Sequence, residues 1–373
     1  MQHNIKNRLT LREAKFEDER AVQALCLRNG MFGEQSELAW QWFWLDNPFC
    51  PEGWPLGWVL EANNKIVGFI GNIPRSYSYK RKQLIIGAAH SFTVDEGFRS
   101  STFQLLAAFF TRNPADVLIF SSANELAGQL FRVAGAKMIP QEDYNQSLFW
   151  VISGTDFVAS VSRKKGYNKC ISTMIGGFFG PFFALERIFK QRWRSYQHSG
   201  VQFVQPFEAS SEFDTLWESL TDERYNCFLA RRDGNAIRWQ FGHPAASHRK
   251  PIILCNRING QLKGYAVLTR WDSPELDLKR MMITDLIALN NNPDIIIDLV
   301  AAAYKYARDE GVHVLQMMGF PPFIRKIIGV LKPIKQRYAV WPFWYFTKDA
   351  DIVADITHPE NWYASMMDGD STL

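Results

Sequence analysis

The sequence reads NNKIVG at residues 63–68 and NGQLKG at residues 259–264, an offset of 196 residues. Paired Asn and Gly residues between apolar stretches are typical of the short turns of β-hairpins. Two further landmarks keep the offset: Pro48 with Pro244, and residues 117–120 with 313–316. Such a repeat is far longer than the units of about 20 to 50 residues that build solenoids. We therefore predict that each copy is a whole domain and that the two domains face each other across a cleft.

Composition narrows the classes of function. The chain has 373 residues, of which 47% are hydrophobic and 21% charged, and its net charge is +4. That charge is too small to indicate a nucleic-acid-binding protein. The five cysteines are scattered without a CxxC pair or a Cys/His cluster, so we expect neither a disulfide framework nor a metal site. The first residues lack the apolar segment of a signal peptide, which favours the cytoplasm.

Alternating and helical patterns along residues 8–150 predict an α+β domain. The expected order is a strand, two helices, an antiparallel meander that includes the hairpin, and then β-α-β-α-β. We expect residues 147–150 to close this unit as its last strand. We predict two such three-layer domains, each a mixed, mostly antiparallel sheet flanked by helices. The predicted parts are a domain at residues 1–152, a linker at 153–198, a second domain at 199–350 and a tail at 351–373.

The linker has an unusual charge pattern. Residues 171–185 are mostly apolar, whereas residues 161–194 hold eight Lys and Arg residues and a single acid, Glu186. The apolar stretch is shorter than the about 20 residues that a membrane-spanning helix needs. Two interpretations stay open. One is a helical hairpin packed across both domains, and the other is a segment, residues 163–194, that dips into an anionic lipid surface at the inner face of the membrane.

One motif points to a family. It places an asparagine, a small residue, an aromatic and a glycine at spacings of 3, 7 and 11 residues: Asn124, Ala127, Phe131 and Gly135. Upstream, the residues VDEGFR at 94–99 join a predicted strand to a predicted helix through an arginine. Together these features resemble the GNAT superfamily of acyl-CoA-dependent acyltransferases. The resemblance is good over residues 8–150 and rests on element order alone over residues 201–347.

The resemblance implies that acetyl-CoA or another acyl-CoA lies in a gap between two splayed strands. Its pyrophosphate would bind at the N-terminus of the next helix, where unpaired N–H groups favour an anion. The implied binding residues are Phe92, Thr93, Val94, Arg99, Ser100, Ser101, Thr102, Asn124 and Phe131. The loop that starts at Arg99 lacks the glycines of the family, and Phe131 replaces the usual tyrosine acid. The site therefore uses another acid, needs none or is inactive.

Three side chains are candidates for a general base. His90 lies on the strand that would face the thioester, and histidine suits proton transfer near neutral pH. Glu96 follows that strand in the loop. Asp285 lies in the corresponding strand of the second copy, where a carboxylate among apolar residues needs a partner. For each of the three, a structural role is the alternative.

We expect an acyltransferase that moves an acyl group from CoA to an amino or hydroxyl group of a small molecule or glycan. The tail at 358–370 and the residues at 238–244 resemble tandem GNAT-like proteins encoded with surface-polysaccharide genes, which implies a sugar acceptor. Phe320 replaces the asparagine of the motif in the second copy, so that copy is expected to shape the acceptor site or to stabilise the first. The alternatives are a Fem-type transferase, which takes an aminoacyl donor from tRNA, and a non-catalytic scaffold.

Overall fold

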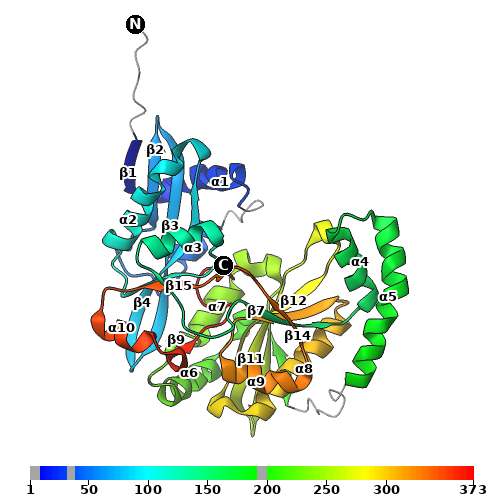
Figure 1. The fold of residues 1–373 in the computed structure, drawn as a ribbon. Coiled ribbons are helices and arrows are strands. Elements are labelled where there is room, and N and C mark those ends of the chain that lie inside the picture. The colour runs from blue at the N-terminus through cyan, green and yellow to red at the C-terminus, as the bar shows by residue number, and fades with distance from the viewer. Residues whose placement is uncertain (1–8, 32–37, 191–199) are drawn as a thin grey trace.

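The computed structural model describes residues 9–31, 38–190 and 200–373. Its first half contains a strand, a helix and a helical turn, then a hairpin, a third antiparallel strand, and a helix, strand and helix (Figure 1). The elements are β1 (Leu9–Glu13), α1 (Glu19–Arg28), η2 (Gln41–Leu45), β2 (Gly57–Ala62), β3 (Lys65–Tyr79), β4 (Lys82–Val94), η3 (Glu96–Ser101), α2 (Thr102–Arg112), β5 (Val117–Phe120), α3 (Glu125–Val133), β6 (Lys137–Met138) and β7 (Gln146–Val151).

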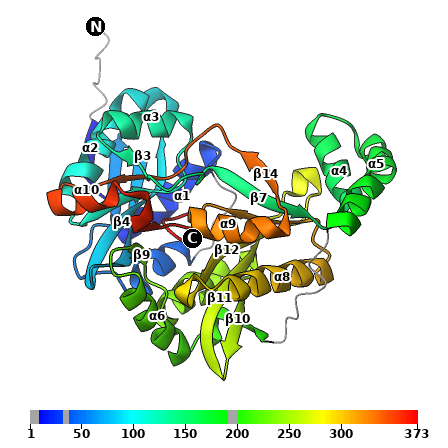
Figure 2. The ribbon, with the colours of Figure 1, turned by 60° about the horizontal axis from the view of Figure 1, so that its bottom comes forward.

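The second half repeats this order and then adds a tail (Figure 2). Its elements are β8 (Val201–Val204), α6 (Ser211–Glu223), β9 (Phe228–Ala230), α7 (Gly234–Gly242), β10 (Ile252–Ile258), β11 (Gln261–Arg270), η7 (Pro274–Leu276), β12 (Arg280–Ala288), α8 (Pro293–Asp309), β13 (Val314–Met318), α9 (Pro322–Ile328), β14 (Ile334–Arg337), β15 (Trp344–Phe346), α10 (Ala350–Ile356) and β16 (Trp362–Tyr363).

The two repeated turns lie on corresponding elements, because Asn63-Asn64 joins β2 to β3 and Asn259-Gly260 joins β10 to β11. All four turn residues have positive φ, between 51° and 76°. Asn and Gly tolerate this conformation better than other residues, which explains why the sequence marks these turns so clearly. Both predicted hairpins are confirmed.

Two mixed sheets, mostly antiparallel, form the core, which confirms the predicted α+β fold of two domains. The first sheet runs β1-β2-β3-β4-β5-β15-β6, with β9 beside β3 and β16 beside β9; the second runs β14-β7-β13-β12-β11-β10-β8. Alternate residues of β5 enter different clusters: Val117 and Ile119 pack with α1, whereas Leu118 and Phe120 pack with α2 and α3. Helices therefore cover both faces of the first sheet, as the period of two in a strand requires.

The two halves exchange strands. β7 pairs with β13 and β14 of the second sheet, so the prediction that residues 147–150 close the first unit is wrong. In return, β15 from the second half pairs with β5 and β6 of the first sheet. The apolar residues of β7 correctly predict a buried strand, but they do not encode which sheet buries it. Each sheet is thus completed by a strand from the other half.

The predicted linker forms a helical hairpin of α4 (Gly154–Lys164) and α5 (Lys169–Lys190), while residues 191–198 lie outside the described residues. The hairpin projects beside the second sheet as an arm (Figure 1), rather than across both domains. It is held through α4, since Arg163 donates to the carbonyl of Leu276 at 2.9 Å and Ser160 to that of Asp277 at 3.3 Å. The hairpin is confirmed, but Phe178 and Phe179 on α5 remain exposed.

Contacts between the halves include a reciprocal pair. The indole N–H of Trp42 donates to the carbonyl of Trp239 at 2.7 Å, and the indole of Trp239 donates to the carbonyl of Trp42 at 2.8 Å. Beside them, Arg75 is fully buried and donates to Gln240 at 2.7 Å and to the carbonyl of Gly369 at 3.0 Å. The guanidinium of Arg75 therefore links the first sheet to the second half and to the tail by hydrogen bonds.

Candidate functional site

A gap opens where β4 and β5 diverge. The two parallel strands pair only from Ile86 to Ala88 on β4 and from Val117 to Ile119 on β5. Past this point, β4 carries a bulge at Ser91, whose φ is 52°, and the register with β3 shifts there. A bulge bends its strand and leaves one residue out of the ladder, so it turns β4 away from β5 and frees backbone polar groups at the gap.

A pocket of about 530 Å³, which we call the gap pocket, lies along this opening. Six of the nine residues implied by the sequence line it: Phe92, Thr93, Val94, Arg99, Thr102 and Asn124. The remaining wall comes from Asn29, Met31, Phe103, Leu126, Ala127 and Leu130. Ser100 and Ser101 belong to the turn η3 and do not line the pocket, while Phe131 lines the pocket next to it. Most of the residues that the family resemblance implied therefore lie together around this pocket.

The gap pocket reaches the start of α2. The N-cap of the helix is Ser101, which makes no side-chain capping bond, and the N–H of Thr102, the first residue of α2, donates to the carbonyl of Arg99. Arg99 and Thr102 line the pocket at this helix end. Asn124 instead caps α3, because its side-chain oxygen accepts a bond from the N–H of Ala127 at 2.9 Å. Its observed task is to fix the beginning of α3 at the edge of the gap.

A second pocket, of about 490 Å³, adjoins the first and shares four residues with it: Met31, Phe92, Asn124 and Ala127. We call it the tail pocket, because Asp370, Ser371 and Leu373 line it together with His90 of β4. Arg249 and Trp271 of the second half form part of the wall. Both halves and the tail therefore contribute to one cavity next to the strand gap.

His90 and Asp370 form a buried pair in the tail pocket. The Nδ1 atom of His90 lies 3.3 Å from Oδ2 of Asp370, and both side chains are less than 10% exposed. Ser121, which follows β5, donates to Oδ1 of Asp370 at 2.5 Å. The edge of the Phe43 ring packs on the imidazole at 4.8 Å. A carboxylate against one ring nitrogen orients the imidazole and fixes its proton, as a general base requires.

Arg249 is the cation of the tail pocket. Its guanidinium stacks over the Trp271 ring at 3.8 Å, and its buried Nε atom has no hydrogen-bond partner among the described residues. Burial lowers the pKa of this arginine from its ordinary value. A cation that faces a cavity without its own carboxylate is suited to bind an anionic group of a ligand.

The other two candidate bases lie away from both pockets. Glu96 is exposed on η3 and lines neither of them. Asp285 is fully buried on β12, where it accepts bonds from Arg232 at 2.9 and 3.1 Å and from Tyr265 at 2.8 Å. Burial, followed by the charge of Asp285, raises the pKa of Tyr265 well above its ordinary value. The geometry of Asp285 favours a structural role, which was the alternative from the sequence.

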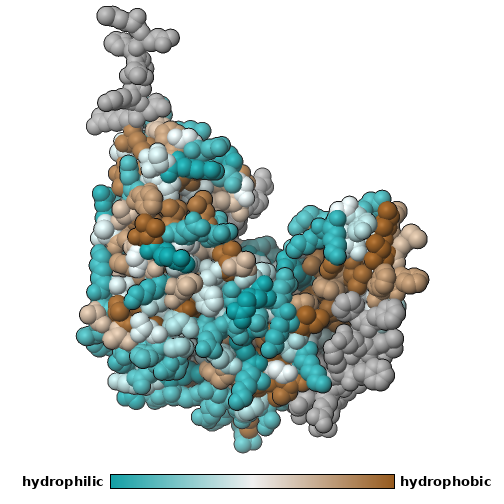
Figure 3. Space-filling model, viewed as in Figure 1, coloured by the Kyte–Doolittle hydropathy of each residue, from teal (hydrophilic) through white to brown (hydrophobic). Residues whose placement is uncertain are grey.

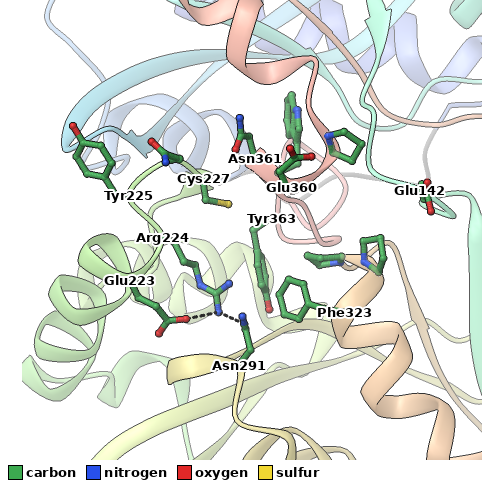
Figure 4. A pocket seen from close by; sticks show the side chains of 15 residues that line it. Glu142, Glu223, Arg224, Tyr225, Cys227, Asn291, Phe323, Glu360, Asn361 and Tyr363 are labelled. Atoms are coloured by element: carbon green, nitrogen blue, oxygen red, sulfur yellow. Dashed lines mark hydrogen bonds and ion pairs between the residues drawn. The ribbon is translucent and has the colours of Figure 1, made fainter.

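The corresponding gap of the second half is filled by the tail. Met367 donates its N–H to the carbonyl of Thr284 on β12 at 3.1 Å, and Phe320 donates to the carbonyl of Ala364 at 3.0 Å. A pocket of about 690 Å³ remains outside this plug (Figure 4), where Asn291 and Phe323 lie near the starts of α8 and α9. Arg224 crosses this pocket and bonds Asn291 at 2.6 Å. In the second half, residues of the tail therefore occupy the position that corresponds to the gap pocket of the first half.

Solved acyltransferase structures share this architecture. A GCN5-related N-acetyltransferase from Anabaena variabilis matches with a TM-score of 0.55 at 12% identity, over 92% of this chain and 73% of that one. This chain has the GNAT fold. A GCN5-related N-acetyltransferase from Kribbella flavida gives a TM-score of 0.56 at 11% identity, over 92% and 72% of the two chains. A protein from Enterococcus faecalis, described as a probable N-acyltransferase, gives 0.55 at 8% identity, over 91% and 72%.

Comparison of the sequence with known proteins identifies no relative, since no protein-family model and no curated protein matches the chain. None of the helices in the described ranges combines the length and apolar character needed to cross a bilayer.

Proposed function

We propose that the chain is an acyltransferase that binds acyl-CoA in the gap pocket and acylates an amino or hydroxyl group held in the tail pocket. The observation that carries this proposal is the position of the gap pocket. The pocket lies where two parallel strands diverge, beside the start of α2, which has no side-chain cap. Six of the nine residues that the family resemblance implied line it. A partly apolar pocket that ends at Arg99 and the start of a helix suits a pantetheine arm and its pyrophosphate.

Each part of the gap pocket has a proposed task. Arg99 and the positive end of the α2 dipole would bind the pyrophosphate, with the Thr102 side chain beside them. The bulged end of β4, from Phe92 to Val94, would bond the pantetheine amides and the thioester oxygen through its backbone. Acetyl-CoA is the donor that we propose first, and the same pocket fits other acyl-CoAs by their shared CoA part.

His90 is the proposed base. It lines the tail pocket two residues before Phe92, which lines both pockets, and Asp370 holds its Nδ1 side. His90 would accept the proton that the amine or hydroxyl of the acceptor loses as the new bond to the acyl carbon forms. Phe131 is buried and has no acidic proton, so the leaving thiolate would take its proton from water or from the imidazolium.

The tail pocket indicates the class of acceptor. Arg249 supplies an available cation and Trp271 an aromatic face, which together suit a sugar that carries an acidic group. A sugar of a surface-polysaccharide precursor, the acceptor implied by the tail sequence, meets this description. We propose it as the substrate class, with the amine or hydroxyl near His90 and the acid near Arg249.

Titration calorimetry with acetyl-CoA and with CoA tests the donor site. The double variant Arg99→Ala, Asn124→Ala is expected to lose binding, because it removes a pyrophosphate contact and the cap that positions α3. The matched control, Arg308→Ala with Glu360→Ala, removes an exposed arginine and a residue of the second-half pocket, and should bind as the parent does.

The same titration separates the alternatives. Equal loss of binding in the control, or no binding in the parent chain, would remove the donor assignment. Retention of aminoacyl-tRNA without CoA binding would favour a Fem-type transferase, and binding of neither donor a non-catalytic pair.

A further inference from the structure

Helix α5 presents a row of large apolar side chains to solvent, which we call the α5 ridge. Their exposed fractions are 44% for Ile171, 74% for Met174, 76% for Phe178 and 53% for Phe179. Spacings of three and four residues place the first three on one face of the helix. Figure 3 shows hydrophobic surface along the outer edge of the arm that α4 and α5 form. A contiguous apolar surface of this kind marks a contact site more often than a free surface.

On the opposite side of α5, the buried residues within 169–181, the part whose side chains the structure describes, are all small. Gly176 and Gly180, four residues apart, lie against Thr155 and Ala159 so closely that a Cβ on either glycine would overlap α4. Ser172 completes this buried side. The helix therefore turns small residues inward and large apolar residues outward, the reverse of a helix packed in water. Close contact through small residues is how helices associate in an apolar medium.

The charge around the ridge selects one occupant. Residues 157–181 contain four Lys and Arg residues and no acid. Arg163 is used in the contact with η7, whereas Lys164, Lys165 and Lys169 are exposed at the turn next to the ridge. Residues 157–181 of a second copy docked on the ridge would bring no acid to pair with these lysines. An anionic lipid surface would instead neutralise them.

We propose that the α4–α5 hairpin is a peripheral membrane anchor, with the α5 ridge inserted among acyl chains and the three lysines on anionic headgroups. This inference does not depend on the proposed enzymatic function. The residues that line the gap and tail pockets all lie outside α4 and α5, so insertion of the arm would leave the lining of both pockets uncovered.

Vesicle flotation tests the anchor with the full chain. Vesicles of phosphatidylcholine with 30% phosphatidylglycerol, about a third anionic, should carry the protein, and pure phosphatidylcholine should carry much less. The variant Met174→Glu, Phe178→Glu should bind the anionic vesicles about 10-fold less or worse. Both side chains are mostly exposed, so the change should not disturb folding. The control Phe203→Glu, Phe207→Glu alters two phenylalanines that are 51% and 63% exposed outside the hairpin, and it should bind as the parent does.

A second pair of variants separates charge from apolar contact. Lys164→Glu, Lys165→Glu should abolish the preference for anionic vesicles, whereas Lys335→Glu, at an exposed site on β14, should not. The proposal is overturned if the parent chain does not float, or floats equally well with the α5 ridge changed. It is also overturned if sedimentation shows a dimer that Phe178→Glu dissociates. Calorimetry with CoA should give the same result for all these variants, so either proposal can fail alone.

Discussion

Asp370 reaches the proposed base from a position 280 residues away in the sequence. Because its carboxylate lies against Nδ1 of His90, we expect it to hold the imidazole ring in the orientation that proton transfer from the acceptor needs. His90→Gln should lower turnover by about 100-fold or more, and Asp370→Asn by a smaller factor. Both should bind CoA as tightly as the parent, so kcat falls while affinity is kept. The control Asp309→Asn changes an exposed acid. Loss of CoA binding in Asp370→Asn would show a structural role instead.

Arg249 should decide which acceptors are used. A charge-assisted hydrogen bond contributes about 1.5–3 kcal/mol, so Arg249→Gln should raise KM for an acidic sugar by about 10-fold or more. For a neutral sugar the change should be small. Arg249→Lys keeps the charge but loses the flat stack on Trp271. Its KM for the acidic sugar should therefore lie between those of the parent and of Arg249→Gln. Steady-state kinetics with one acidic and one neutral acceptor provide the measurement, and an equal effect on both would contradict the assignment.

At the scale of elements, the sequence predicts what is encoded locally. The hairpins follow from Asn and Gly at positive φ, and the strand gap was implied by the family resemblance of residues 94–99 and 124–135. The partner of β7 could not be predicted, because alternating apolar residues specify burial but not the sheet that provides it. Strand exchange is decided by contacts between residues about 170 apart, such as Leu148 and Met317.

The residues of the candidate site were likewise predicted only in part. Residues 92–94, Arg99, Thr102 and Asn124 were found because they lie within one continuous stretch that resembles a family. Asp370 and Arg249 were missed because only the fold brings them to His90. The tail at 358–370 was noted for its family resemblance alone, and the structure shows that Asp368 and Asp370 are both buried despite their charge. A buried carboxylate needs a partner, and this requirement could have drawn attention to them.

At the scale of the whole molecule, a buried ion network joins the second sheet to the tail. Arg232 bonds Asp285 and also lies 3.3 Å from Asp368, with all three side chains buried. Asp285→Ala should lower the free energy of unfolding by about 3–5 kcal/mol, because it leaves a buried arginine without its main partner. Asp222→Ala, at an exposed pair with Arg81, should cost about 1 kcal/mol or less. Urea denaturation measures both, and equal effects would contradict the role of the network.

The reciprocal bonds of Trp42 and Trp239 have the form of an isologous contact, in which residue i meets j and j meets i, as in a C2 homodimer. The chain is in this sense a dimer fused into one polypeptide, with strands swapped between its subunits. In a symmetric homodimer the two copies of a site are identical, whereas in one fused polypeptide they can diverge. One gap is closed by residues 364–367, and the same segment continues to place Asp370 beside the open gap. The covalent structure thus keeps one gap open and the other closed, where a symmetric homodimer would have two alike.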